Sequence, residues 1–167
     1  TETITSSVHH LGASHGGRRI KRSLNINVKS VKFVDATARE SYKKIFLLKD
    51  YIETRQKEIE EFNSKYDFDS SVLINGRRMT NLGVRHYVES YLKNHPKIHQ
   101  GLTLLVRQLP LEDKGIPIEV YCFTKTTAWN EYEDIQADVF DHLLASASYF
   151  DLDVFQQVSG SDFSKNL

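Results

Sequence analysis

The first patterned segment of the chain, residues 18–29, alternates apolar and polar positions. Its apolar side chains fall on one side of an extended chain: Ile20, Leu24, Ile26 and Val28. A period of two residues is typical of a β-strand with one buried face. The pattern therefore predicts a strand here, which continues through "SVKFVD" after a kink.

Residues 40–66 have the spacing of a helix instead. Their apolar side chains follow a heptad seam: Ile45, Leu48, Ile52, Ile59, Phe62 and Tyr66. Such a seam is typical of a helix with one apolar side, and Glu53 and Lys57 form a supporting i, i+4 pair. We predict a single long helix. Its seam is explained either by packing on its own domain or by contact between the subunits of an oligomer.

Shorter elements follow the long helix. Residues 72–80 predict an extended segment broken by a turn at Asn75-Gly76. Residues 80–96 carry an apolar stripe at helical spacing and predict a helix that stops before Pro96.

The C-terminal half predicts a hairpin, a helix and a last strand. Residues 102–110 and 116–124 are apolar runs on either side of a polar loop, which indicates two antiparallel strands. Residues 129–150 have helical spacing, and residues 152–160 predict a final strand.

The order of these elements predicts an α+β domain. Without the long helix, the order is β-α-β-β-α-β, which is that of a ferredoxin-like plait. The helix over 40–66 is then an insertion. The predicted divisions are a flexible leader or cloning remnant at 1–17, an α/β domain at 18–160 and a frayed C-terminus at 161–167.

The overall charge balance argues against a dedicated nucleic-acid binder. Lys and Arg number 22 and Asp and Glu number 22, so the formal net charge is zero, whereas nucleic-acid binders carry a net basic surface. Cys122 is the single cysteine, which excludes a disulfide within the chain, favours a reducing compartment and fits a small buried side chain. No apolar run approaches the ~18 residues of a membrane span. The chain begins at Thr1 rather than Met, and we expect it to be a piece of a longer protein.

Two short stretches concentrate positive charge. The first, "GGRRIKRS", holds Arg18, Arg19, Lys21 and Arg22 at the start of the predicted first strand. These cations could bind nucleic acid, line a pore or form a solvated strand face. The second, "NGRRMTN", holds Arg77 and Arg78, and its Thr80 or Asn81 is placed to cap the following helix.

No motif of catalysis or cofactor binding is present. The chain has no glycine-rich phosphate loop, no HExxH and no GxSxG. The N-terminal histidines, His9, His10 and His15, fit no zinc pattern. Asp138 and His142 share a helix side, for which a surface ion pair is a simpler interpretation than a metal site. We predict no catalytic, cofactor-binding or metal-binding residue, and a chain that is not an enzyme.

A plait of this kind also occurs in RNA-recognition modules, which stack bases on strand aromatics. Tyr121 and Phe123 stand two positions apart and face one side of a strand, but the glycine-flanked signature of those modules is absent. We therefore interpret this pair as core. A soluble regulatory or RNA-binding ferredoxin-like module remains the alternative function.

Several long strings in the chain point to a known family. They are "GGRRIKRSLNI", "LLKDYIE", "NGRRMTNLGVRHYVESYLKNHP", "IHQGLTLLVRQLP", "GIPIEVYCFT" and "YEDIQADVFDHLLA" with "VFQQVSG". Together they resemble the C-terminal cytoplasmic region of bacterial mechanosensitive channels of the small-conductance (MscS) family, in its miniconductance, YbdG-like branch. The resemblance covers about residues 16–160.

The resemblance implies a channel that opens under membrane tension in hypoosmotic shock. In that family, membrane helices form a heptameric pore, and a β domain and an α/β domain form a hollow cytoplasmic cage with lateral openings. This chain would be the α/β part of a homo-oligomer in the cell inner membrane, with the membrane helices absent, no cofactor and no nucleic acid. Its basic residues would line the vestibule or pair with a neighbouring subunit: Arg18, Arg19, Lys21, Arg22, Arg77 and Arg78. The insertion at 40–66 would carry the distinct behaviour of the branch.

Overall fold

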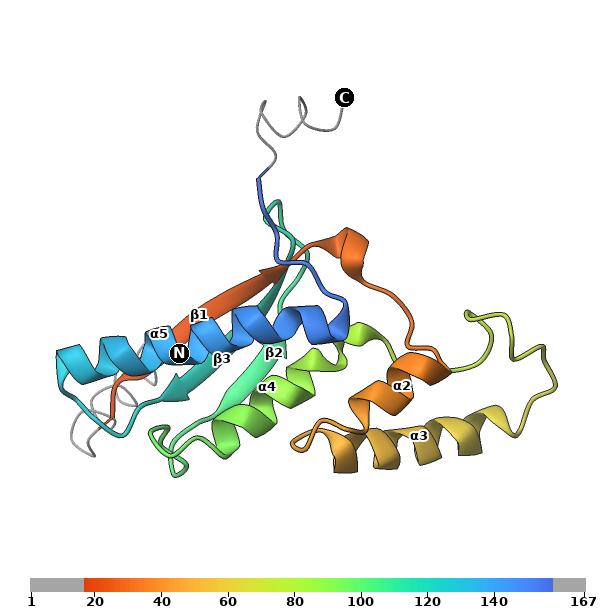
Figure 1. Cartoon of the computed structure of the whole chain (residues 1–167), viewed down its shortest axis with the longest axis horizontal. Coiled ribbons are helices and arrows are strands. Elements are labelled where there is room, and N and C mark those ends of the chain that lie inside the picture. Colours follow the sequence, from red (N-terminus) through yellow and green to blue (C-terminus); the bar gives the residue numbers. More distant parts are fainter. Residues whose placement is uncertain (1–16, 158–167) are drawn as a thin grey trace.

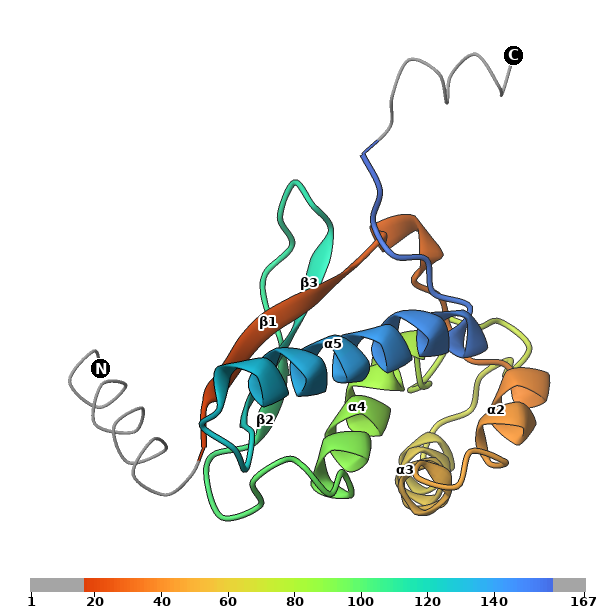
Figure 2. The same cartoon turned by 60° about the vertical axis from the view of Figure 1, so that its left-hand side comes forward.

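The computed structural model describes residues 17–157 as a small antiparallel sheet with helices on one of its faces (Figures 1 and 2). The strands are β1 (Arg19–Ile26), β2 (Leu105–Gln108) and β3 (Ile116–Phe123), in the order β1-β3-β2. The helices are α2 (Ala36–Tyr42), α3 (Lys49–Asn63), α4 (Val84–Lys93) and α5 (Trp129–Ser146). Short 3-10 turns are η1 (Val28–Ser30), η2 (Asn81–Gly83) and η3 (Ala147–Phe150). This architecture confirms the α+β class.

The sheet confirms the first strand and the hairpin. β1 buries Ile20, Leu24 and Ile26, as its alternation predicts. It pairs antiparallel with β3 along its whole length, from Arg19 opposite Phe123 to Ile26 opposite Ile116. β2 pairs with the other edge of β3. The strand does not continue beyond residue 26, because the Asn27 side chain accepts from the Lys29 amide at 3.0 Å and begins η1.

The predicted last strand is wrong for residues 152–157. They form an isolated antiparallel bridge between Val154 and Ile26, beside β1, where a plait would place its fourth strand. Leu152 is buried there, but Gln156 and Gln157 have no apolar side chain to bury, and pairing stops before them. Residues 158–160 lie outside the described residues, as do almost all of the predicted leader and the predicted frayed C-terminus. A complete four-stranded ferredoxin-like plait is therefore not formed within residues 17–157.

The predicted single helix over 40–66 is two helices. Asp35 caps α2 by accepting from the Ala38 amide at 2.8 Å, and residues 43–48 form the turn that leads into α3. Tyr42 and Leu48 are both buried. Six positions apart, their side chains would point about 120° apart around a straight helix. The break allows both to reach the same core.

The heptad seam packs on its own domain over the first part of α3. Leu48 and Ile52 join the main hydrophobic core, and Ile59 is also buried. Further along, Phe62 is 36% exposed and Tyr66 is 60% exposed. Packing within the domain therefore explains the start of the seam and does not explain its end.

Helices α4 and α5 lie together across one face of the sheet (Figure 2). The core lies between these two helices and the sheet. The buried side chains of this layer are Val84, Val88 and Leu92 from α4 and Ile135, Val139 and Leu143 from α5. They meet Ile118, Val120 and Cys122 of β3 in one cluster. The predicted helices over 80–96 and 129–150 are thus confirmed, the second with η3 as its last turn.

The predicted extended segment at 72–80 is mostly turns, and its end closes the base of the inserted helices. Phe33 forms an antiparallel bridge with Thr80, and the Val34 amide donates to the Met79 carbonyl at 2.8 Å. The chain consequently enters and leaves the insertion at the same place, and the α2–α3 unit extends away from the sheet (Figure 1).

The buried side-chain amide of Asn81 stands beside this base. Its Oδ1 accepts from the Lys32 amide at 2.9 Å, and its Nδ2 donates to the carbonyls of Ser30 and Phe150, each at 2.9 Å. Asn81 is 1% exposed and Phe150 is also buried, so loss of this side chain would leave the Phe150 carbonyl without a partner and without access to water. Asn81, in the turn η2 that precedes α4, thereby joins η1, the segment that leads into the insertion, and η3. The neighbouring Thr80 caps η2, because its hydroxyl accepts from the Leu82 amide at 3.3 Å. Helix α4 itself begins after Gly83 and has no side-chain cap, so the predicted capping of this helix by Thr80 or Asn81 is wrong.

We expect Asn81→Ala to lower the free energy of unfolding by about 2–4 kcal/mol, because it leaves the buried Phe150 carbonyl unpaired and removes two further hydrogen bonds, to Lys32 and Ser30. Urea unfolding followed by circular dichroism measures the change. Asn130→Ala, on the exposed side of α5, is the matched control and should change stability by less than about 0.5 kcal/mol. Equal losses for the two variants would contradict the role given to Asn81.

Burial also defines the chemistry of the single cysteine. The Cys122 side chain is fully buried, and burial raises the pKa of its thiol to about 12. We expect the native thiol to stay unmodified by a disulfide reagent at about pH 8, since the thiolate is the reacting form. The same chain in urea should react fully. Rapid modification of the native chain would show that β3 is not buried as described.

Candidate functional site

The first group of predicted site residues lies on and just before an edge strand. We call Arg18, Arg19, Lys21 and Arg22 the basic strand. Strand alternation places Arg19 and Lys21 on the sheet face opposite to Ile20, away from the helices. Arg22 lies on the same face as Ile20 and reaches α5. The four cations therefore divide between two faces around one strand.

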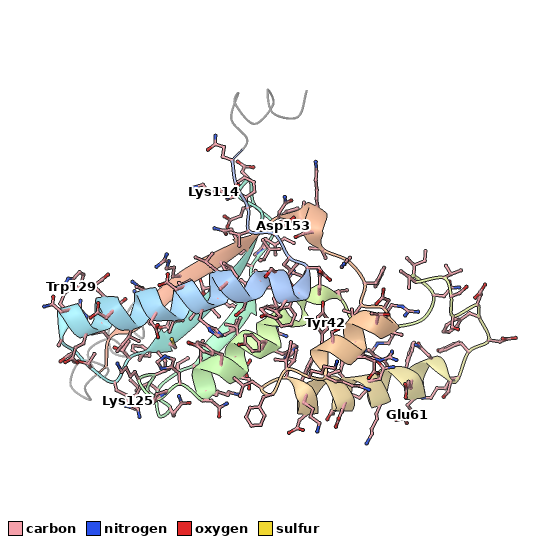
Figure 3. All side chains as sticks on the ribbon, in the orientation of Figure 1. Tyr42, Glu61, Lys114, Lys125, Trp129 and Asp153 are labelled. Carbon is pink, nitrogen blue, oxygen red and sulfur yellow. The ribbon has the colours of Figure 1, made fainter. Side chains whose placement is uncertain are left out.

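Aromatic side chains, rather than carboxylates, accompany these arginines. The Arg18 guanidinium lies over Trp129 and Tyr132 at the start of α5, 4.5 and 5.0 Å from the ring centroids. Figure 3 labels Trp129 at this end of the helix. The Tyr132 hydroxyl donates to the Arg19 carbonyl at 2.6 Å and so attaches the start of β1 to α5.

The other two arginines of the basic strand have aromatic neighbours of their own. Arg19 lies 5.9 Å from the Tyr121 centroid, and Arg22 lies 4.4 Å from that of Phe140. Such contacts contribute about 0.5–1 kcal/mol at exposed sites and leave the charge in place. Within residues 17–157, no member of the basic strand forms an ion pair with Asp or Glu. Its charge is thus held in position without being neutralised.

Part of the outer edge of β1 is open in the described chain. The Arg19 carbonyl is taken by Tyr132, and the Asn25 carbonyl accepts from the Phe155 amide at 2.8 Å. Main-chain groups of alternate residues point to the same edge, so those of Lys21 and Ser23 point outward between these two contacts. Charged side chains on such an edge oppose uncontrolled strand pairing.

The second group, Arg77 and Arg78, lies in a different place. Asn63 at the end of α3 holds the Arg77 main chain, accepting from its amide at 2.8 Å and donating to its carbonyl at 2.9 Å. Gly76 before it has φ +69°, and a Cβ there would collide with Phe68 and Asn63. The turn at Asn75-Gly76 is thus confirmed. It lies beyond the far end of α3, so the structure does not bring the two basic groups together (Figures 1 and 2).

Asp138 and His142, considered above as an ion pair or metal ligands, have separate partners. His142 Nε2 lies 2.7 Å from the Tyr87 hydroxyl, and its ring stacks on Tyr91 with centroids 4.1 Å apart. Asp138 lies 3.9 Å from His95 Nε2. Burial lowers the pKa of His95, an effect that Asp138 opposes. Within residues 17–157, no group of three His, Cys, Asp or Glu side chains is arranged to hold a metal ion.

The sequence reasoning missed the aromatic partners of the arginines. Trp129, Tyr132 and Phe140 lie within about 80° of one another around α5, since positions three apart differ by about 60° and positions eleven apart by about 20°. That spacing was a usable signal. What it could not supply was the register of β1 against α5, which is a tertiary contact.

Two comparisons with known proteins bear on the chain. Residues 82–146 match the family model described as "Mechanosensitive ion channel MscS, C-terminal". The "Low conductance mechanosensitive channel YnaI" of Escherichia coli (strain K12) is 40% identical over 79 residues, an alignment that covers 41% of this chain and 23% of that protein. The match therefore spans about a quarter of its relative. The narrower assignment to the YbdG-like branch stays a prediction.

The matched segment coincides with well-defined elements of the fold. It holds α4, the β2–β3 hairpin and α5, which are the two helices and two of the three strands around the core. None of the helices within residues 17–157 has the length and apolar character needed to cross a membrane. The segment that holds most of the core is thus similar to the C-terminal region of MscS-family mechanosensitive ion channels.

Proposed function

We propose that this chain is the cytoplasmic vestibule and assembly domain of a mechanosensitive ion channel that opens under membrane tension in hypoosmotic shock. The observation that carries the proposal is the match of residues 82–146 to the MscS C-terminal model. In this proposal the complete protein lies in the cell inner membrane, and the chain forms part of a homo-oligomer, a heptamer as the resemblance implies. Its role is not enzymatic.

The basic strand supports a role in ion permeation. Its cations have no carboxylate partner among residues 17–157, although the chain is neutral overall. Unneutralised charge along a confined wall raises the local concentration of counter-ions. Placed in a vestibule, the basic strand would favour anions over cations.

A second feature supports assembly. Glu131, Asp134 and Asp138 are exposed and follow one side of the first half of α5. An acidic stripe and a basic strand on one chain can pair between copies, and such a head-to-tail interface closes into a ring when the rotation between subunits allows. The basic strand would then have a subunit-pairing role in addition to, or in place of, vestibule lining.

The alternative of an RNA-binding module loses its main support. Phe123 is fully buried, and its ring meets Tyr121 edge-on at 5.9 Å. A base can stack only on an exposed ring, so this aromatic pair does not form a binding platform. No specific observation favours the regulatory module.

Charge reversal tests the permeation role. We expect the triple variant Arg19→Glu, Lys21→Glu, Arg22→Glu, made in the complete channel polypeptide, to lower the anion-to-cation permeability ratio by at least about twofold. Reversal potentials in membrane patches under suction measure the ratio. The matched control reverses three exposed lysines of the α3 region: Lys49, Lys57 and Lys65. If the ratio changes equally in both, or in neither, the basic strand does not line the ion path.

The coding sequence offers a simpler test of the whole proposal. Upstream of the Thr1 codon we expect several apolar runs of ~20 residues, each long enough to span a membrane, and then a short β-rich stretch. Sequencing the gene gives the answer directly. A start codon immediately upstream, with no apolar run, would contradict the channel function and leave a soluble protein of the same fold.

A further inference from the structure

A cavity of about 280 Å³ lies where the inserted helix α3 meets the start of α4. Its wall includes Tyr51 and Arg55 from α3, Arg78 from the segment after the Asn75-Gly76 turn, and Arg85 and His86 from α4. Small-molecule sites in proteins begin at about 300 Å³. The cavity is just below this range, so any occupant must be a small ligand and cannot be a folded partner.

Three guanidinium groups line this cavity, and no Asp or Glu is among its lining residues. Among the described residues, the one carboxylate that pairs with any of these groups is that of Glu58, whose Oε2 lies 3.1 Å from Arg55 Nη1. Glu58 does not line the cavity. Arg78 uses Nε and Nη2 on the carbonyls of Leu73 and Ser70. A guanidinium has five N–H donors, so Arg55 and Arg78 keep donors without a protein partner among residues 17–157. The cavity has the charge and the donors to hold an oxyanion.

His86 contributes a neutral aromatic wall. Its Nε2 lies 3.1 Å from Arg85 Nη2, and because a guanidinium only donates, this nitrogen accepts and the ring is uncharged. Burial, together with the charge of Arg85, lowers the pKa of His86. The Tyr51 ring stacks on it with centroids 3.9 Å apart. A flat apolar group can pack beside this pair.

The rest of the cavity lining is mainly apolar, and its polar members are Tyr42, Thr80 and Gln108. Apolar lining residues are Val34, Leu48, Ile52, Met79, Leu82 and Phe150. Tyr42 also lines it, and its buried hydroxyl has no hydrogen-bond partner among the described residues. Burial raises the pKa of Tyr42 to about 12, so the hydroxyl keeps its proton.

We propose that this cavity binds a small organic oxyanion, in which a phosphate or carboxylate group engages Arg55, Arg78 and Arg85 and a flat apolar body lies against Tyr51 and His86. Arginine forks suit both kinds of oxyanion because each presents paired acceptors. Arg85 and His86 fall inside the segment matched to the channel family, whereas Arg55 and Arg78 fall outside it. The site is thus completed by the insertion, and its existence does not depend on the channel function proposed above.

Titration of the isotope-labelled chain by NMR tests the site with four probes at constant ionic strength. They are phenyl phosphate, benzoate, inorganic phosphate and benzyl alcohol. We expect saturable shifts of the amide signals around Arg55, Arg78 and Arg85 with phenyl phosphate or benzoate, and the tighter of the two identifies the oxyanion. Inorganic phosphate should bind more weakly, and benzyl alcohol should not bind.

A pair of variants on α3 gives the matched control. Arg55→Gln should weaken binding by about fivefold, since it removes one charged donor, whereas Lys57→Gln removes the same charge outside the cavity and should leave affinity unchanged. If both variants weaken binding equally, the loss of affinity reflects the net charge of the chain and not the cavity, and the proposal is overturned. It is also overturned by binding of benzyl alcohol as tight as that of phenyl phosphate, by no saturable shift with any probe, or by shifts that follow protein concentration and so indicate contact between copies.

Discussion

The side-chain amide of Asn81 is the contact on which the arrangement of the chain depends. It connects carbonyls and an amide that lie 49, 51 and 69 residues from it in the sequence. With the Phe33–Thr80 bridge, it brings both ends of the α2–α3 insertion to one point. An insertion whose ends meet adds little constraint to its host, since its loop is already closed. The α4–α5 layer and the sheet can therefore pack as one unit with α2 and α3 attached at their side.

The arginines of this protein are positioned by rings and carbonyls more than by acids. Arg18 lies on Trp129 and Tyr132, and Arg78 donates to two main-chain carbonyls. Neither kind of contact cancels the charge. A neutral chain consequently presents two separate positive regions, the basic strand and the cavity beside α3, whose orientations are fixed by local packing. In the two proposals made above, the basic strand would act on inorganic ions and the cavity would bind a single organic anion.

The elements predicted correctly from the sequence are those whose apolar side is also the side that is buried in the folded chain. Alternation in β1 and the 84-88-92 stripe of α4 each describe a face that is buried against the core. The long helix failed because Tyr42 and Leu48 must both be buried, a condition set by the core and not visible in a heptad seam. The prediction of the last strand is wrong because pairing with β1 is limited to the bridge at Val154, and the polar Gln156 and Gln157 follow it. Asn81 suited a helix cap by residue type, while its actual role depends on segments far away in sequence.

The sequence predicts which residues form the candidate site but does not predict how they are arranged in space. Four cations near the start of a strand can be read directly from "GGRRIKRS". Which of them faces the helices follows from strand parity once the buried face is known. The aromatic partners on α5 and the cavity against α3 arise only when distant segments pack.

The antiparallel pairing of β1 with β3 has a mechanical consequence. The two strands pair over the full length of β1, from Arg19 to Ile26, and the Tyr132 hydroxyl adds a contact at its first residue. A pull applied at residue 17 along the strand axis would load all rungs of this ladder together, in shear, instead of opening them one after another. Force entering the domain through this strand would be transmitted to β3 and α5 before any single hydrogen bond carries it alone. The edge strand can thus act as a stiff tether for the α4–α5 layer.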